Sequence, residues 1–221
     1  GYSAVKLRRY QELYEHSLFG EFNKIKTGLS TGVVENLFVG MHTLNMLNME
    51  YVIYNPNALP LKNEEAYGKA WLATTPIFAE NADQEFSLTL NQKSKNEVVI
   101  SEEEKGNITG VSYTVDSLSS IQMISYEPND LQYEATFTDS ALVVFSEIFY
   151  KDGWEATIDG EPVPIARANF ILRALEVPSG KHNIRFEFKP NSYYLGSKIS
   201  AMSSIIILLV MFFLGYKGYR K

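Results

Sequence analysis

One uncharged stretch near the carboxyl end constrains this chain more than any other feature of its sequence. Ile199–Tyr216 contains no acidic or basic residue, and it lies between Lys198 and a basic tail at residues 217–221. As a helix it nearly crosses a hydrocarbon core of roughly 30 Å, and flanking lysines reach the headgroup layer. The sequence therefore predicts a transmembrane helix and basic tail over residues 193–221.

A buried core helix is the alternative for this stretch. Core helices usually keep one polar stripe, whereas Ile205–Leu214 is apolar on every side. Tyrosines lie at both ends, where the aromatic belt of a membrane interface would place them; they are Tyr193, Tyr194, Tyr216 and Tyr219. Both patterns favour a membrane helix, so membrane lipid is the first predicted partner.

The rest of the chain has the composition of a globular domain. A net charge of -6, with no basic cluster outside the tail, argues against nucleic-acid binding. The absence of cysteine excludes disulfides and thiolate metal sites. His16, His42 and His182 lack the spacing of metal ligands, so no metal or cofactor is predicted. Phosphate-binding glycine loops and nucleophile motifs are also missing, so no catalytic residue is assigned.

Residues 1–55 are predicted to form a helical segment that ends in a short strand. A first helix is expected over residues 4–19, with Gly20 as its stop, and a second over residues 31–49. The strand is expected at Tyr51–Tyr54. One face of the first helix collects Leu7, Tyr10, Tyr14 and Leu18.

Residues 56–120 are predicted to be a mixed α/β connecting segment. Trp71–Ala79 is expected to be extended and Asn81–Gln92 to be a short helix, which is followed by the apolar stretch Val98–Ile100. The acidic run Glu102–Glu104 lacks the ligand spacing of a calcium loop and is interpreted as a solvated loop.

Residues 121–192 are predicted to form an antiparallel β-sandwich, because strand patterns alternate with turn residues. The clearest strand is His182–Lys189, where apolar and polar side chains alternate. Leu142–Phe145 is apolar on both faces, as in a central strand covered on both sides. The predicted fold is α+β, with amino-terminal helices, the sandwich-like domain and one carboxy-terminal transmembrane helix. Further strands are expected at Ile108–Val115, Ile121–Glu127, Leu131–Phe137 and Ala141–Tyr150.

Four residues near the predicted hairpins form a candidate sugar-binding surface: Trp154, Arg167, Asn169 and Arg173. Aromatic rings and amide or guanidinium groups are what such surfaces use to stack and hydrogen-bond. The alternative is that Trp154 fills the core while the other three satisfy turn backbone. A glycan binder should expose Trp154 or Trp71 in a groove beside Arg or Asn, whereas a structural module should bury both tryptophans.

Three stretches resemble the YfhO family of bacterial membrane proteins. They are GYSAVKLRRYQEL at residues 1–13, LNMLNMEYVI at residues 44–53, and GWEATIDGEPVPIARANFILRALEVPSGKHNIRFEFKP at residues 153–190, the last followed by Tyr-Tyr-Leu-Gly. Lys151-Asp152 and Met49-Glu50 depart from the family pattern without disturbing the predicted turn or strand. The middle of the chain carries little of this resemblance.

The resemblance implies a polytopic protein of the bacterial cytoplasmic membrane, related to glycosyltransferases that use polyprenyl-phosphate sugars for envelope glycopolymers. Its catalytic acidic residues would belong to early extracytoplasmic loops outside this chain. We therefore expect a non-catalytic periplasmic accessory domain and the last membrane span of a longer protein. Envelope glycan or lipid-linked sugar would be its partner through the parent protein. The alternatives are a carbohydrate-binding module in its own right, and a structural or protein-docking sandwich without a ligand.

Overall fold

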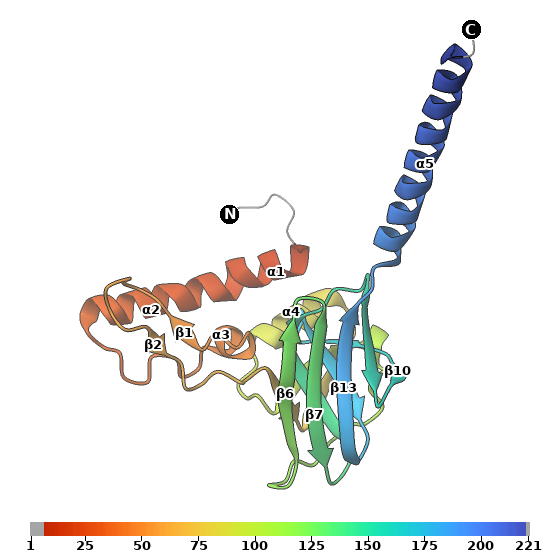
Figure 1. Ribbon diagram of the computed structural model, residues 1–221. Helices are drawn as coiled ribbons and strands as arrows, with labels where there is room; N and C mark the ends of the chain where they lie inside the picture. The colour runs from red at the N-terminus through yellow and green to blue at the C-terminus, as the bar shows by residue number, and fades with distance from the viewer. Residues whose placement is uncertain (1–6, 220–221) are drawn as a thin grey trace.

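The computed structural model describes residues 7–219 and divides them into a helical region, a sandwich of two sheets and one long carboxy-terminal helix (Figure 1). This confirms the predicted α+β class and the order of its parts. The described residues exclude 1–6, where the first predicted helix begins, and 220–221 of the basic tail.

One sheet has five antiparallel strands in the order β10-β9-β13-β7-β6. In β13 the side chains of Ile184 and Phe186 are buried while their neighbours Asn183 and Arg185 are exposed. This is the alternation that the sequence predicted, because one face of the sheet packs inward. The strands are β6 (Ser120–Glu127), β7 (Asp130–Phe137), β9 (Trp154–Ile158), β10 (Glu161–Val163) and β13 (Gly180–Phe188).

The other sheet has six strands in the order β3-β8-β12-β11-β5-β4. Its β4 and β5 are parallel and are joined by α4 (Ala82–Leu90), whose first turn is capped by the Asn81 side chain. The remaining pairs are antiparallel. The strands are β3 (Ala70–Ala73), β4 (Thr75–Ala79), β5 (Glu97–Ser101), β8 (Ala141–Ile148), β11 (Ala166–Ala168) and β12 (Leu172–Val177).

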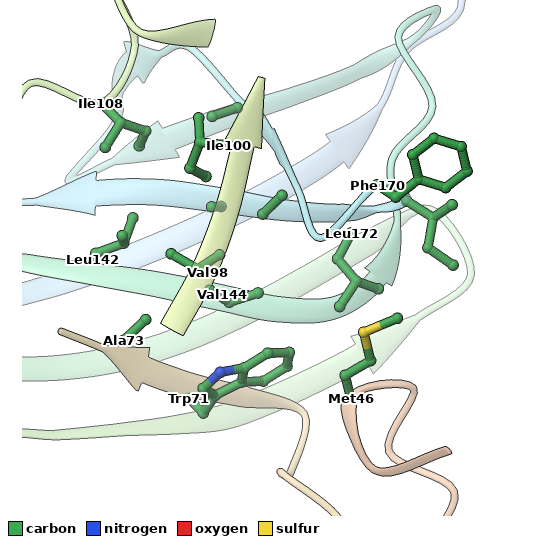
Figure 2. Packing of buried hydrophobic residues seen from close by; sticks show 14 of the residues in the cluster. Met46, Trp71, Ala73, Val98, Ile100, Ile108, Leu142, Val144, Phe170 and Leu172 are labelled. Atoms are coloured by element: carbon green, nitrogen blue, oxygen red, sulfur yellow. The ribbon is translucent and has the colours of Figure 1, made fainter. Parts of the chain in front are cut away.

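The six-stranded sheet is covered on both faces. Toward the five-stranded sheet, Phe145 and Leu175 belong to one buried cluster; on the opposite face, Val144 and Leu172 belong to another. Figure 2 shows this second cluster, in which Met46 and Trp71 pack near Val144 and Leu172. Because β8 lies between two cores, all of its first five residues are buried, as the apolar run Leu142–Phe145 predicted.

The predicted helix over residues 4–19 continues far beyond Gly20. Helix α1 (Arg8–Leu13), a π-helical turn (Tyr14–Leu18) and α2 (Phe19–Thr31) follow one another without interruption. Gly20 was wrong as a stop, because burial of Leu18 and Ile25 on the inner face holds the helix together across it. The helix ends instead at Gly32, which adopts a left-handed conformation with φ of 75°.

Two other predicted elements are also wrong. The expected helix at residues 31–49 is reduced to α3 (His42–Met46), because Gly32 and Gly40 both have positive φ and break the helical path. The expected strand Ile108–Val115 is a loop. Its Ile108 and Tyr113 are buried in the same cluster as Val144 and Leu172. The apolar spacing that suggested a strand therefore belongs to a loop that covers this cluster.

The helical region packs around a third apolar cluster that includes Leu18, Ile25 and Leu44. The carboxylate of Glu21 accepts hydrogen bonds from the backbone N–H groups of Thr43 (3.1 Å) and Leu44 (2.8 Å) at the start of α3. Burial raises the pKa of Glu21, and these two donors oppose that change. A short hairpin of β1 (Tyr51–Val52) and β2 (Leu61–Lys62) completes the region.

Helix α5 (Asn191–Tyr219) leaves the sandwich directly from the end of β13, with only Lys189 and Pro190 between them (Figure 1). Over Asn191–Lys217 it is long and apolar enough to cross a membrane, and none of that window is buried against the rest of the protein. Within residues 7–219 no other helix meets those criteria. Water is an unfavourable surrounding for so large an apolar surface.

The six-stranded sheet contains strands from both sides of residue 120, the residue before the predicted sandwich. β3, β4 and β5 come from the predicted connecting segment 56–120, and they form half of the six-stranded sheet. The division of the chain at 55, 120 and 192 stays a prediction about domains. The six-stranded sheet itself runs across the second of these boundaries.

Candidate functional site

An open groove of about 690 Å³ lies where β9 and β10 face the loop after β8 and the short 3-10 turn Glu102–Glu104. We call it the Trp154 groove. Its walls combine aromatic rings, prolines and charged groups. The lining residues are Glu103, Glu104, Asn107, Phe149, Tyr150, Lys151, Trp154, Glu155, Ala156, Thr157, Pro162, Val163, Pro164, Ile165 and Arg167.

Arg167 is fixed in one wall of the Trp154 groove by carboxylates. Its Nε lies 3.3 Å from Oε1 of Glu85, whose side chain is fully buried, and its Nη2 lies 3.8 Å from Oε2 of the exposed Glu103. The guanidinium also stands 5.7 Å from the ring centroid of Phe149. Arg167 is therefore held in place, and 14% of its side chain stays exposed.

A second groove, of about 560 Å³, continues from the Trp154 groove toward the start of α5. Both grooves are lined by Trp154, which thus stands between them. Gly153 lies in the floor with φ of 112°, and a Cβ there would meet the Phe188 ring at 2.8 Å. The Asp152-Gly153 turn therefore needs glycine both for its backbone conformation and for its contact with the β13–α5 junction.

Arg173 lies behind Trp154 rather than in the groove. It is 3% exposed, and its guanidinium stacks on the Trp154 ring at 4.1 Å and faces the Phe186 ring at 5.6 Å. Its Nε donates to the carbonyl oxygen of Ile148 (3.0 Å), while Nη1 has no hydrogen-bond partner within residues 7–219. Burial lowers the pKa of Arg173 to about 10, which still leaves it charged at neutral pH.

A carboxylate and a lysine lie near this buried arginine. Burial raises the pKa of Glu147, and the positive charges of Arg173 and Lys69 act against that change. Glu147 and Lys69 also line a smaller opening of about 300 Å³ at the edge of the sandwich. The charge of Arg173 thus interacts with that of Glu147 without a direct ion pair, while its guanidinium is held against the Trp154 ring.

Asn169 is part of the sheet and is 2% exposed. Its backbone N–H donates to the Val99 carbonyl (2.8 Å), and its Oδ1 accepts from Val99 N–H (2.9 Å) and from Gln92 Nε2 (3.0 Å). With φ of 44°, Asn169 lies in the left-handed region that asparagine tolerates better than most residues. Its side chain thus extends the pairing of β5 with β11.

The structure therefore brings Trp154 and Arg167 together in one groove and places Asn169 and Arg173 in the interior. Trp71 is also interior, at 5% exposure, while Trp154 is half-buried. Most of the charged groups of the Trp154 groove were not among the predicted site residues. The acidic run was interpreted only as a solvated loop, and its spacing carries no sign that it faces β9. These missed groups are Glu103, Glu104, Lys151 and Glu155.

The sequence model of a family described as bacterial membrane protein YfhO matches residues 63–200, which is more than half of the chain. The chain belongs to the YfhO family. The match includes both sheets, the two grooves and the first part of α5. It also includes most of the middle segment, where the resemblance was weak, whereas the resembling stretches at residues 1–13 and 44–53 lie outside it.

No curated protein and no solved structure matches this YfhO-family chain. Within residues 7–219, no group of three or more His, Asp or Glu side chains is placed to hold a metal ion. A membrane-protein family and an apolar helix long enough to span agree in associating the chain with a membrane. Chemically, the two grooves present one indole, one anchored guanidinium and several carboxylates, and the second groove reaches the start of that helix.

Proposed function

We propose that this chain is a non-catalytic module on the extracytoplasmic side of the bacterial cytoplasmic membrane. It holds an envelope glycan or a lipid-linked sugar close to the membrane, for a polyprenyl-phosphate-sugar glycosyltransferase site elsewhere in its parent protein. The observation that carries this proposal is the position of Trp154 between two connected grooves, one of which reaches the first residues of α5. A sugar chain bound there would lie beside the lipid surface.

The chemistry of the Trp154 groove supports a sugar ligand. Sugar rings pack against indole through their C–H groups, while their hydroxyls need both donors and acceptors. Arg167 and Lys151 supply donors, and carboxylates of the groove, including that of Glu155, supply acceptors. The groove is open, as a binding surface for a long polymer requires.

A structural or protein-docking module is the second candidate, and one observation favours it. The guanidinium of Arg173 already occupies one face of the Trp154 ring at 4.1 Å, and the Phe188 ring lies 5.3 Å away. The indole is therefore partly committed to packing, and a sugar would have to use its remaining surface. Binding measurements separate the two candidates.

We expect sugar binding to change the fluorescence of Trp154. The chain has two tryptophans, so the Trp71→Phe variant of the full chain in lipid nanodiscs leaves Trp154 as the sole emitter. Titration with neutral, amino-sugar and acidic hexasaccharides should shift its emission and saturate for at least one class. Replacing Lys151 or Glu155 by alanine should weaken that binding about tenfold or more, because a hydrogen bond to a charged group contributes about 1.5–3 kcal/mol.

The matched control is Asp139→Ala, which changes an exposed charge in the turn between β7 and β8, outside both grooves. The variant that combines Asp139→Ala with Trp71→Phe should bind the sugar with the same affinity as Trp71→Phe alone. If no hexasaccharide changes the emission at millimolar concentration, the glycan role is abandoned and the structural module remains. Equal weakening by all three alanine variants would also contradict a ligand in the groove.

A label in the turn between β7 and β8 tests on which side of the membrane the domain lies. The chain has no cysteine, so Asp139→Cys introduces the only thiol. In bacterial cells whose outer layer admits small molecules, a membrane-impermeant maleimide should label this cysteine without lysis. Labelling that appears only after the cytoplasmic membrane is opened would place the domain on the cytoplasmic side.

A further inference from the structure

The long helix formed by α1, the π-helical turn and α2 carries a row of large side chains that the rest of the described chain leaves partly exposed. Its inner face packs on the domain through Leu13, Leu18 and Ile25, which are nearly fully buried. Beside this buried face the helix carries four large side chains that are between 36% and 53% exposed. We call these four the aromatic stripe; they are Leu7, Tyr10, Tyr14 and Phe19.

The π-helical turn aligns this stripe. Tyr10 and Tyr14 are four residues apart, as neighbours on an α-helical face are, but Tyr14 and Phe19 are five apart. The extra residue in the turn returns Phe19 to the same side, and the two ring centroids lie 6.3 Å apart. In an uninterrupted α-helix Phe19 would be turned by roughly a further 100°. The same turn keeps Leu13 and Leu18 together on the inner face.

The stripe lies at the end of the domain from which α5 departs. In Figure 1 the long helix begins near that end of the sandwich and extends away from it to the left, with α3 and α4 below it in this view. It is tied down there by the ion pair of Arg9 with Glu85 (2.8 Å), by the His16 ring against Phe86 and by the hydrogen bond between Ser17 and Thr43. Leu7 and Tyr10 line a small cavity together with Phe149, and the residues directly after Phe149 line the groove at the start of α5.

The short link to α5 keeps that end of the domain near the lipid surface. Two residues span at most about 7 Å of chain. Tyrosine and phenylalanine beside leucine suit the interface between headgroups and acyl chains, where the ring is buried and the tyrosine hydroxyl remains hydrated. The same helix exposes Arg8, Lys24 and Lys26, whose charges suit anionic headgroups.

We infer that the aromatic stripe lies in the headgroup layer of the membrane that α5 crosses, so that the domain contacts lipid at a second place. The occupant of this surface is the bilayer itself. The inference requires α5 to span the membrane, and it goes beyond the proposed glycan role and does not depend on it.

A fluorescent label at the stripe tests this contact in the full chain. Tyr14→Cys provides the only thiol of the chain for an environment-sensitive dye, and Tyr10→Cys repeats the measurement one turn earlier in case the first substitution disturbs the π-helical turn. The labelled proteins are placed in vesicles of phosphatidylcholine and phosphatidylglycerol, with or without lipids that carry a shallow nitroxide. Both labels should emit at shorter wavelength and lose most of their emission to the nitroxide lipids.

Two labelled variants calibrate the result. A dye at Ser200→Cys in α5 should be quenched by nitroxide lipids, and a dye at Asp139→Cys should be quenched only by aqueous iodide. Stripe labels that behave like Asp139 would overturn the inference by placing the helix in water. Labels protected from both quenchers would overturn it differently, because a protein surface rather than lipid would then cover the stripe. The glycan titration is unaffected by either outcome.

Discussion

Replacing Phe145 by alanine is expected to destabilise the sandwich by about 3–5 kcal/mol, the range for removing a fully buried aromatic ring. Phe145 has no exposed surface, and its ring packs edge-to-face on Tyr133 at 5.0 Å and on Phe186 at 4.8 Å. The alanine variant leaves a cavity between the two sheets and removes both ring contacts. Denaturant unfolding of the full chain in detergent micelles, followed by near-ultraviolet circular dichroism, measures the loss.

Two variants show whether the loss comes from packing at this position. Phe145→Leu keeps most of the volume and should cost roughly 1.5 kcal/mol or less. Val111→Ala shortens an apolar side chain that is 81% exposed and should change stability by no more than about 0.5 kcal/mol. A Phe145→Ala loss as small as that of Val111→Ala would mean that the two sheets do not share this core.

We expect a second large loss, of about 2–4 kcal/mol, when Glu85 is replaced by alanine. The Glu85 side chain is fully buried between the Arg9 Nη1 atom (2.8 Å) and the Arg167 Nε atom (3.3 Å). Removing one member of a buried ionic group leaves the others desolvated without compensation; the partial exposure of both arginines moderates this cost. The same unfolding measurement reports the change in stability.

The matched control is another ion pair, on the helix α1 that carries Arg9. Arg8 and Glu12 are also 2.8 Å apart, but 91% of the Arg8 side chain is exposed, so Glu12→Ala should cost less than about 0.5 kcal/mol. The Glu85→Gln variant keeps the shape of the side chain and one acceptor oxygen. Its loss of stability should lie between those of Glu85→Ala and Glu12→Ala. If Glu85→Ala and Glu12→Ala are equal within error, the buried position of Glu85 contributes nothing and the expectation fails.

The β-sandwich was predictable because its signals are local. Alternation in β13, the doubly apolar run of β8 and the Asp159-Gly160 turn each need only a few neighbouring residues. In that turn Asp159 and Gly160 both have positive φ, as a two-residue hairpin between β9 and β10 requires. These local patterns identified most of the strands of both sheets.

The helical region was harder to predict because its period changes within one helix. The predicted face joined Leu18 to Leu7, Tyr10 and Tyr14, yet the π-helical turn places Leu18 on the inner side and the other three outside. A constant helical period cannot separate these residues. Gly20 was misinterpreted for a related reason, since packing of the inner face outweighs the roughly 1 kcal/mol cost of a helical glycine.

The candidate site was predictable only in part. The structure places Trp154 and Arg167 in one groove, whereas Arg173 is interior and could have been assigned there from the sequence. It alternates with Leu172 and Ala174 in a strand that is apolar on both faces, so either orientation buries it. Glu85 could not have been found, because Arg9 and Arg167 are 76 and 82 residues away in the sequence.

The junction between β13 and α5 determines how the grooves stand relative to the bilayer. Pro190 has a restricted φ, its carbonyl already accepts the N–H of Tyr193, and the N–H of Lys189 donates to the Gly153 carbonyl. A flexible tether would let the sandwich rotate and rise freely above the lipid. This junction instead ties the chain just before α5 to the Gly153 turn beside Trp154, so wherever α5 crosses a membrane the grooves stay within a short distance of the lipid surface.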